Sequence, residues 1–167
     1  MQFNDVTPTL DNHWRAVILF GRNVASYKFA LAKSLLELAE REREVVPLSE
    51  LAEPFSRHIC EHLRLSDQQG TFSRSRFLDA CRQYNAGELD HGALVERTAR
   101  LGFNNVIDAF HVVNQQEIPE RFFVDERRDS GAIRLTDQIF QLRELEQAPN
   151  LDYEVEARWR LVETAWS

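Results

Sequence analysis

A polar break between two apolar segments is the feature that most constrains the fold of this chain. Residues 12–38 are largely apolar on both sides of a Phe-Gly-Arg-Asn run at 20–23, and such a break is typical of a turn between two helices. After the break, apolar residues recur at the spacing of one helix face; they are Tyr27, Ala30, Leu31, Leu35 and Leu38. We therefore expect a helical pair over about residues 9–42.

The composition indicates one ordinary globular core. The chain has 167 residues, 43% of them hydrophobic, and a formal net charge of −7, which argues against a surface dominated by phosphate binding. No apolar run approaches the roughly 18 residues that cross a bilayer, and the first residues lack the pattern of a secretory signal. Cys60 and Cys81 fall in separate predicted helices. We expect two reduced, buried thiols, a cytoplasmic location and no membrane partner.

The rest of the chain predicts more helices and one β-hairpin. Helices are expected over about residues 49–65, 74–85, 89–101, 104–114, 137–146 and 153–167. Strands are expected over 121–125 and 132–136, and Gly87 and Gly102 are expected in left-handed positions at helix ends. The sequence thus predicts a mainly α-helical α+β domain with three sections. These are an N-terminal helical section (1–65), helices plus the hairpin (66–147) and a C-terminal helix (148–167), together one compact domain.

Three helices followed by a hairpin is the element order of a winged helix. In that arrangement residues 104–114 would be the recognition helix, and Arg127 and Arg128 would lie on the wing. The exposed face of that helix would carry Asn104, Asn105, Asp108, His111 and Gln115. A helix with Asp108 and no Arg or Lys is poorly suited to reading the major groove, so this element order is compatible with protein contact as well as with DNA.

Two patterns point to metal chemistry, and both are incomplete. His58-Ile-Cys-Glu-His62 matches the H-x-x-E-H pattern of some zinc peptidases. Because the pattern is short and no further ligand helix follows, we favour a half-buried histidine pair; His58 and His62 are the candidate ligands of a small metal hydrolase. The hairpin and the following helix have the ββα order of an HNH nuclease site, but residues 121–146 contain no histidine. We therefore assign no catalytic residue to this chain.

Basic and aromatic side chains provide the candidate binding residues. Arg22, Lys28 and Lys33 lie close to the helix joint, where cations near a helix N-terminus suit an anion such as a DNA phosphate. The alternative is that these groups tie the joint to neighbouring carboxylates. Trp159 and Trp166 on the last helix are either core residues or anchors of an interface.

Four stretches resemble the N-terminal region of bacterial HNH-endonuclease-family proteins. They are NHWRAVILFGRNVASYKFALAK (12–33), FFVDE (122–126), IRLTD (133–137) and EVEARWRLVETAW (154–166). The resemblance implies an HNH module beyond Ser167 that binds a divalent metal and cleaves DNA, often in defence against foreign DNA. It assigns no catalytic residue and no cofactor to this chain itself.

The function expected from the sequence is therefore accessory. The chain is expected to position a nuclease on DNA or to mediate assembly, with Arg22, Lys28, Lys33, Arg127 and Arg128 as the phosphate contacts in the DNA version. The alternative is a protein-interaction or homodimerisation domain without nucleic-acid contact, with Trp159 and Trp166 as candidate interface residues. The partners that remain open are DNA, a second copy and another protein.

Overall fold

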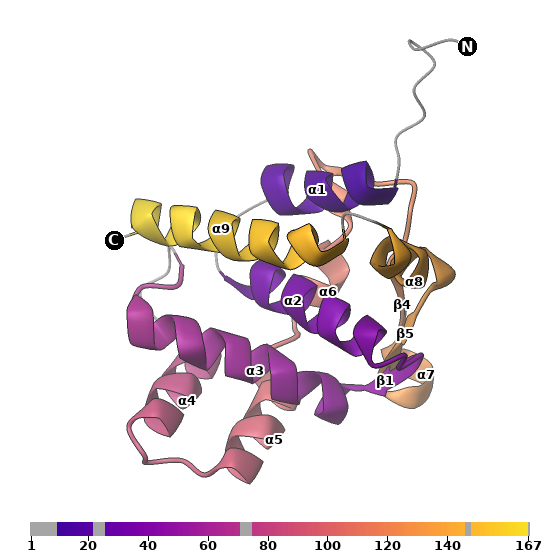
Figure 1. Ribbon diagram of the computed structural model, residues 1–167. Helices are drawn as coiled ribbons and strands as arrows, with labels where there is room; N and C mark the ends of the chain where they lie inside the picture. Colours follow the sequence, from indigo (N-terminus) through magenta and orange to yellow (C-terminus); the bar gives the residue numbers. More distant parts are fainter. Residues whose placement is uncertain (1–9, 22–25, 71–74, 146–147, 167) are drawn as a thin grey trace, which may run out of the picture.

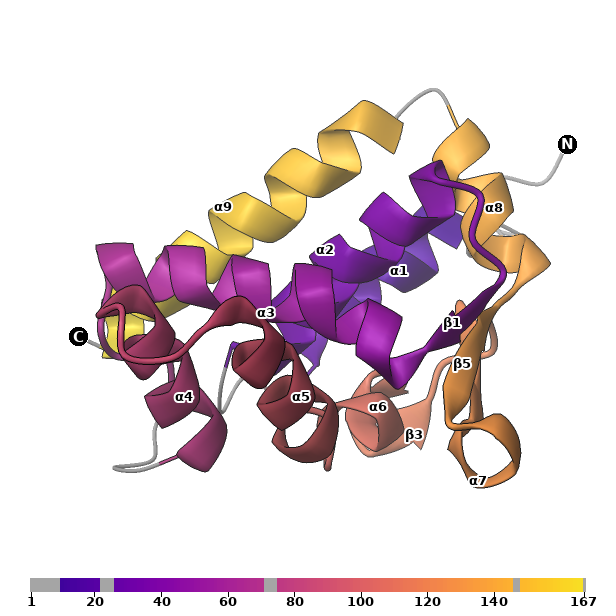
Figure 2. The ribbon, with the colours of Figure 1, turned by 90° about the horizontal axis from the view of Figure 1, so that it is seen from below.

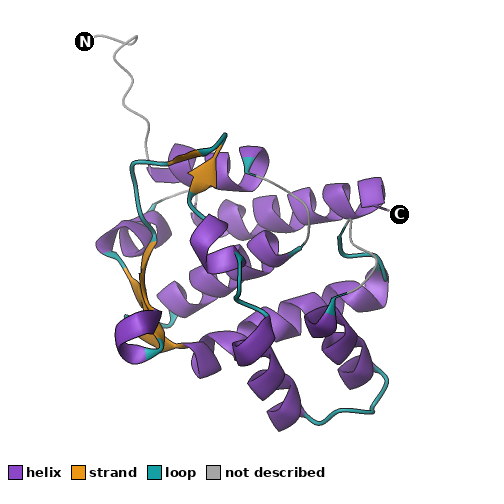
Figure 3. Cartoon of the chain, turned by 180° about the vertical axis from the view of Figure 1, so that it is seen from behind, coloured by secondary structure: helices purple, strands orange, loops and turns teal. Residues whose placement is uncertain are grey.

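The structure is a computed structural model that describes residues 10–21, 26–70, 75–145 and 148–166. Its helices are α1 (Leu10–Phe20), α2 (Tyr27–Glu40), α3 (Leu48–Leu65), α4 (Arg76–Asn85), α5 (His91–Leu101), α6 (Val106–Ala109), α7 (Arg127–Ser130), α8 (Asp137–Glu144) and α9 (Ala148–Trp166). Its strands are β1 (Val45–Pro47), β2 (Val112–Val113), β3 (Gln116–Glu117), β4 (Phe123–Glu126) and β5 (Ala132–Leu135). The mainly helical α+β class is confirmed (Figures 1 and 3).

Helix α2 is the centre of the molecule. Figure 1 shows α1 and α9 on one side of α2 and α3 on the other, and α2 contacts all three as well as α8. Most of α2 is therefore covered by other helices, while Lys33, Glu37 and Glu40 form ion pairs with neighbouring elements. Its fully buried residues include Phe29, Leu31, Leu35 and Leu36. The sequence pattern after the 20–23 break thus marks the core of the fold.

Helices α3, α4 and α5 form a packed unit on the other side of α2 (Figure 2). Local capping starts two of them: the Leu78 N–H donates to Ser75 Oγ (3.2 Å), and the Ala93 N–H donates to Asp90 Oδ1 (2.8 Å). Each cap satisfies a backbone donor that has no partner within its helix. The two predicted buried thiols are present, since Cys60 on α3 and Cys81 on α4 are free and buried.

The two glycines predicted in left-handed positions differ. Gly87 has φ +78° after α4, as expected. Gly102 has φ −77°, so the prediction for it is wrong. The reason for glycine there is close packing, because a Cβ would lie 2.9 Å from the Thr98 carbonyl oxygen and 3.2 Å from Phe55 Cε2.

The predicted hairpin is part of a three-stranded antiparallel sheet with the order β1-β5-β4. The register pairs Val46 with Ile133 and Phe123 with Leu135, and all four side chains are buried. The added strand, β1, comes from the short link between α2 and α3, where the sequence predicts only a helix break. A three-residue strand pairs there because β5 lies alongside it, which no local pattern reveals.

The predicted recognition helix over 104–114 is wrong in length, since only the single turn α6 forms. Asn114 and Gln115 have φ values of +53° and +69°, and they form the turn between strands β2 and β3. His111, expected on an exposed face, is buried, and its Nε2 accepts the Phe122 N–H (3.0 Å). The other residues of the predicted face, Asn104, Asn105, Asp108 and Gln115, are exposed as expected, but a helix of one turn is too short to lie along a DNA groove.

Candidate functional site

A buried polar network attaches α9 to the rest of the chain. The Trp159 indole N–H donates to Ser26 Oγ (3.0 Å) and to Gln69 Oε1 (2.9 Å). The Gln69 amide in turn donates to Glu163 Oε2 (2.6 Å). Ser26, Gln69, Trp159 and Glu163 are each no more than 5% exposed, so their hydrogen bonds replace those that water would make.

His62 on α3 is the centre of that network. Its Nε2 lies 2.9 Å from Glu156 Oε1 and its Nδ1 lies 2.5 Å from Glu163 Oε2. A neutral imidazole carries only one N–H, so one further proton is held either by His62 or by one of the two carboxyl groups. Glu156 also accepts a hydrogen bond from Lys33 Nζ (2.6 Å). The hydrogen bonds from His62 and then Lys33 hold the pKa of Glu156 well below its usual range.

The two histidines of the H-x-x-E-H pattern have separate partners. His58 Nε2 lies 3.3 Å from Glu37 Oε1, whereas His62 faces the carboxylates of α9. The hydrogen bonds from His58 and Arg57 lower the pKa of Glu37 to about 2. Within residues 10–21, 26–70, 75–145 and 148–166, no group of three or more His, Cys, Asp or Glu side chains is arranged to hold a metal ion.

Three of the candidate phosphate contacts are constrained by their surroundings. Lys33 forms an ion pair with Glu156, and Arg127 forms ion pairs with Asp108 (2.9 Å) and Asp125 (2.7 Å). Lys28 is 7% exposed, and burial together with the charge of Arg158 lowers its pKa to about 7. These side chains are therefore poorly placed to neutralise phosphate.

Of the remaining two candidate phosphate contacts, Arg128 is among the described residues. Arg128 is exposed on α7, at the tip of the hairpin. Arg22 lies outside the described residues. Lys28 is in the first turn of α2, whereas α7 adjoins the sheet beyond the other end of that helix (Figure 1). The described candidates thus do not gather on one basic surface.

The prediction that Trp159 anchors an interface needs correction. Its side chain is fully buried within its own chain, and its ring stacks on Phe29 (centroids 6.0 Å apart). It cannot reach a partner unless α9 leaves the core. Trp166, at the end of α9, is half-buried.

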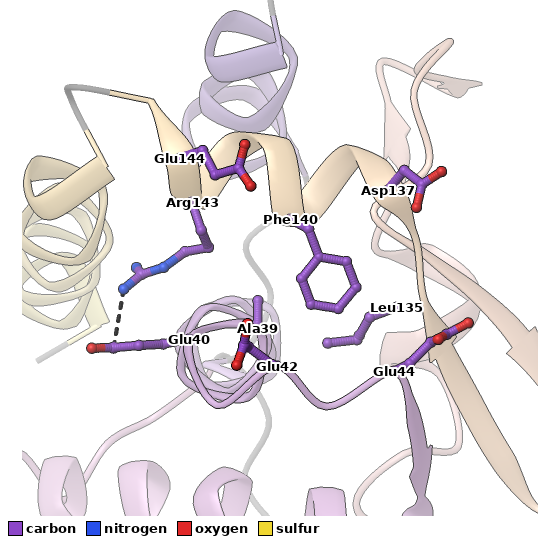
Figure 4. A pocket seen from close by; sticks show the side chains of 9 residues that line it. All are labelled: Ala39, Glu40, Glu42, Glu44, Leu135, Asp137, Phe140, Arg143 and Glu144. Carbon is purple, nitrogen blue, oxygen red and sulfur yellow. Dashed lines mark hydrogen bonds and ion pairs between the residues drawn. The ribbon is translucent and has the colours of Figure 1, made fainter.

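An acidic cleft lies between the end of α2 and helix α8 (Figure 4). It has a volume of about 570 Å³, and its floor consists of Ala39, Leu135 and Phe140. Its rim is formed by carboxylates and one arginine, namely Glu40, Glu42, Glu44, Asp137, Glu144 and Arg143. Arg143 forms an ion pair with Glu40 (3.0 Å). The remaining acidic groups would attract cations, without a geometry that selects one.

An apolar groove lies between α1 and α9, which run side by side (Figure 1). It has a volume of about 340 Å³ and is lined by Trp14, Arg15, Ile18, Leu19, Glu154, Ala157, Arg158 and Leu161. Two of these lining residues are exposed apolar side chains, Leu19 (41% exposed) and Leu161 (61%). Two more exposed apolar residues, Phe20 (64%) and Tyr153 (76%), adjoin lining residues in the sequence. We call the groove and these side chains the α1–α9 face.

The polar groups of the α1–α9 face are unevenly satisfied. Glu154 accepts two hydrogen bonds from Arg15, at 2.7 and 3.0 Å. Arg158 donates from Nη2 to the Leu19 carbonyl oxygen (3.3 Å), but its Nε is buried without a partner in the described part of the chain. The sequence predicted Trp159 and Trp166 as the interface residues of the last helix and did not predict this face. The available signal was the four-residue spacing of Tyr153, Ala157, Leu161 and Ala165.

Comparison with protein-family models, curated proteins and solved structures finds no match to this chain. None of the described helices is both long enough and apolar enough to cross a membrane.

Proposed function

We propose that this chain is a non-catalytic helical domain that assembles its protein by self-association through the α1–α9 face. In the light of the sequence resemblance, the assembled protein is an HNH-type endonuclease of the cytoplasm. Its divalent metal would belong to the HNH module and not to these residues. The observation that carries the proposal is the apolar groove bordered by exposed Leu19, Phe20 and Leu161.

Contiguity distinguishes this face from ordinary surface. Single exposed apolar residues are normal on proteins, whereas contiguous apolar patches with a polar rim mark interaction sites. Here Leu19 and Leu161 come from different helices and line the same groove, and Phe20 follows Leu19 at the end of α1. Arg15, Glu154 and Arg158 supply the polar rim. This combination favours a protein surface as the partner.

DNA positioning is the second candidate, and one observation supports it. Arg128 is exposed at the hairpin tip, and the structure gives it no ion-pair partner in the residues it describes. A single arginine contributes little to binding a duplex, because affinity for the phosphate backbone grows with the number of cations that contact it. The net charge of −7 opposes DNA binding further.

The experiment that tests the proposal compares self-association with DNA binding. Sedimentation velocity over a concentration series should show that the wild-type chain self-associates and that Leu161→Glu does not. The control is Val124→Glu, which adds the same charge at an exposed apolar residue of β4 and should associate like the wild type. Fluorescence anisotropy with a labelled duplex at low salt should show no salt-sensitive binding.

Two results would contradict the proposal. One is a wild-type chain that stays monomeric throughout the series, whether or not it binds DNA. The other is self-association that Leu161→Glu leaves unchanged. Salt-sensitive duplex binding that Arg128→Ala removes would favour the second candidate.

A further inference from the structure

The outer surface of α9 carries a ridge of apolar residues. Tyr153, Ala157, Leu161 and Ala165 are all exposed and follow one another at four-residue spacing. Rows with this spacing form ridges that pack into the grooves of a second helix. Large and small residues alternate along the ridge, so Ala157 leaves a hollow between Tyr153 and Leu161. That hollow opens into the groove with α1, since Ala157 and Leu161 both line it.

Two basic side chains that lie near each other, Arg158 of α9 and Lys28 of α2, are incompletely satisfied by the described part of the chain. Arg158 Nε and Lys28 Nζ are both buried, and neither has a hydrogen-bond partner among the described residues. Burying cations without a partner is unfavourable. Arg158 as a whole is half-buried and lines the groove, so a carboxylate from outside would meet the exposed part of its side chain and not the buried Nε. The face therefore has charge complementarity to an acidic group on a partner.

Such a carboxylate lies on the same flank of α9. Glu154 is one turn before Arg158, and its side chain is 41% exposed while Arg15 holds it in place. If two α9 helices pack antiparallel about a two-fold axis level with Glu156, each Glu154 lies level with Arg158 of the other copy. The two copies then exchange two equivalent ion pairs. An isologous interface has this reciprocity by symmetry.

The same register also fits the ridges together. With the axis level with Glu156, the partner copy's Tyr153 lies level with Trp159, between Ala157 and Leu161. It therefore lies against both Ala157 and Leu161, the two ridge residues that line the groove. The partner copy's Ala157 lies between Tyr153 and Ala157 in the same way. The charge pairing thus selects this register, and the ridge residues are compatible with it.

We infer that two copies of this chain form a two-fold dimer in which α9 packs antiparallel on α9. Tyr153 of each copy enters the α1–α9 groove of the other, and Glu154 and Arg158 form reciprocal ion pairs across the interface. This inference rests on the proposed self-association and adds its geometry and stoichiometry. A second copy is the occupant because the face itself carries the protruding aromatic side chain, the hollow, the basic Arg158 and the acidic Glu154.

The test is a charge-reversal mixing experiment. Glu154→Arg alone would place Arg against Arg158 in both ion pairs, and Arg158→Glu alone would place Glu against Glu154 in both. Each variant should dimerise at least about tenfold more weakly than the wild type, since like charges at an interface oppose association. An equimolar mixture should recover a dimer within a few-fold of the wild type, because both cross pairs become attractive. Light scattering and sedimentation velocity measure these affinities.

Two control variants complete the design. Arg100→Glu makes the same charge change as Arg158→Glu, at an exposed side chain of α5, and should dimerise like the wild type. Tyr153→Ser should weaken the dimer without affecting the fold, because the side chain is 76% exposed in the single chain. Circular dichroism confirms that each variant is folded.

The outcomes separate this inference from the proposed function. Variants that stay monomeric when mixed, or that each dimerise like the wild type, would overturn the two-fold arrangement. If Leu161→Glu still abolishes self-association in that case, assembly through the face stands and only its geometry is wrong. A wild-type chain that is monomeric would overturn both.

Discussion

The imidazole of His62 lies flat against the indole of Trp159, with ring centroids 3.5 Å apart and planes 1° apart. The two residues come from α3 and α9, and Glu156 and Glu163 of α9 hold the two imidazole nitrogens. This contact fixes which side of α9 faces the core. The opposite side, with the apolar ridge, therefore faces outward, so the α1–α9 face depends on the buried network.

Replacing His62 should destabilise the whole domain. His62→Ala removes the stacking partner of Trp159 and one hydrogen-bond partner each of the Glu156 and Glu163 carboxylates, and Glu163 is only 5% exposed. Removing one member of a buried charged pair typically costs about 3 kcal/mol, and urea unfolding followed by circular dichroism would measure it. His91→Ala, at an exposed residue of α5, should change stability by less than about 0.5 kcal/mol. Equal effects of the two substitutions would contradict this account.

Lys28 should make stability depend on pH in the alkaline range. Burial lowers its pKa from 10.5 to about 7. Between these values the unfolded chain holds a proton that the folded chain has lost, so the free energy of unfolding rises with pH across this window. Below pH 7 the lysine is protonated in both states, and the folded protein bears the full cost of burying its charge. Lys28→Met should therefore be more stable than the wild type at pH 6, by more than about 2 kcal/mol. The difference should vanish near pH 10.5.

Lys33→Met is the matched control for that prediction. It removes the same charge from the same helix, but Lys33 forms an ion pair with Glu156 (2.6 Å). We expect a loss of stability at neutral pH instead of a gain. Denaturant titrations across the pH range would detect the opposite signs, and stabilisation by both substitutions would show that Lys28 is not specially placed.

His111 should contribute to acid unfolding. Burial, and to a smaller extent the charge of Arg121, lowers its pKa to about 3. Its Nε2 must be unprotonated to accept the Phe122 N–H. Between pH 6.5 and about 3 the unfolded chain gains a proton that the folded chain resists, so this contribution to stability is lost as pH falls through that range.

The matching variant for His111 keeps an acceptor without a titrating ring. His111→Gln should lose less stability than the wild type between pH 7 and pH 5, by about 2 kcal/mol. Urea unfolding at the two pH values gives the comparison. Identical pH dependence in both proteins would show that His111 does not resist protonation.

The neighbouring arginines at the hairpin tip should behave differently. Arg127 donates to Asp108, to Asp125 and to the Phe103 carbonyl oxygen (3.3 Å), so it links the hairpin to the α5–α6 connection. Arg127→Ala should cost about 1 kcal/mol. Arg128→Ala should stay within about 0.5 kcal/mol of the wild type. Thermal unfolding of the two variants measures the difference, and the reverse order would refute the assignment.

Local pattern predicted most elements of the fold. The periodicity at 49–65 and 74–85 marks α3 and α4 to within two residues, and the alternating run at 132–136 marks β5. These elements form where the sequence predicts them because their apolar spacing already matches the period of a helix or a strand. The one-turn helix α6 was over-predicted, since the turn at Asn114 and Gln115 and the contact of His111 with Phe122 stop the helix.

The candidate site was less accessible to sequence reasoning. Of the described basic residues near the helix joint, Lys33 is held by Glu156 and Lys28 is buried. Trp159 appeared available to a partner and is buried. In each case the decisive neighbour is distant along the chain, and composition and spacing carry no information on such contacts.

The sequence by itself determined that the chain is mainly helical, with an apolar central helix and a short antiparallel hairpin, because propensity and periodicity act over a few residues. Only the tertiary structure decided which side of α9 is buried. Residues separated by about a hundred positions, His62 and Glu163 among them, must meet before that choice exists. The face left outward, with Tyr153 and Leu161, is a consequence of that long-range packing.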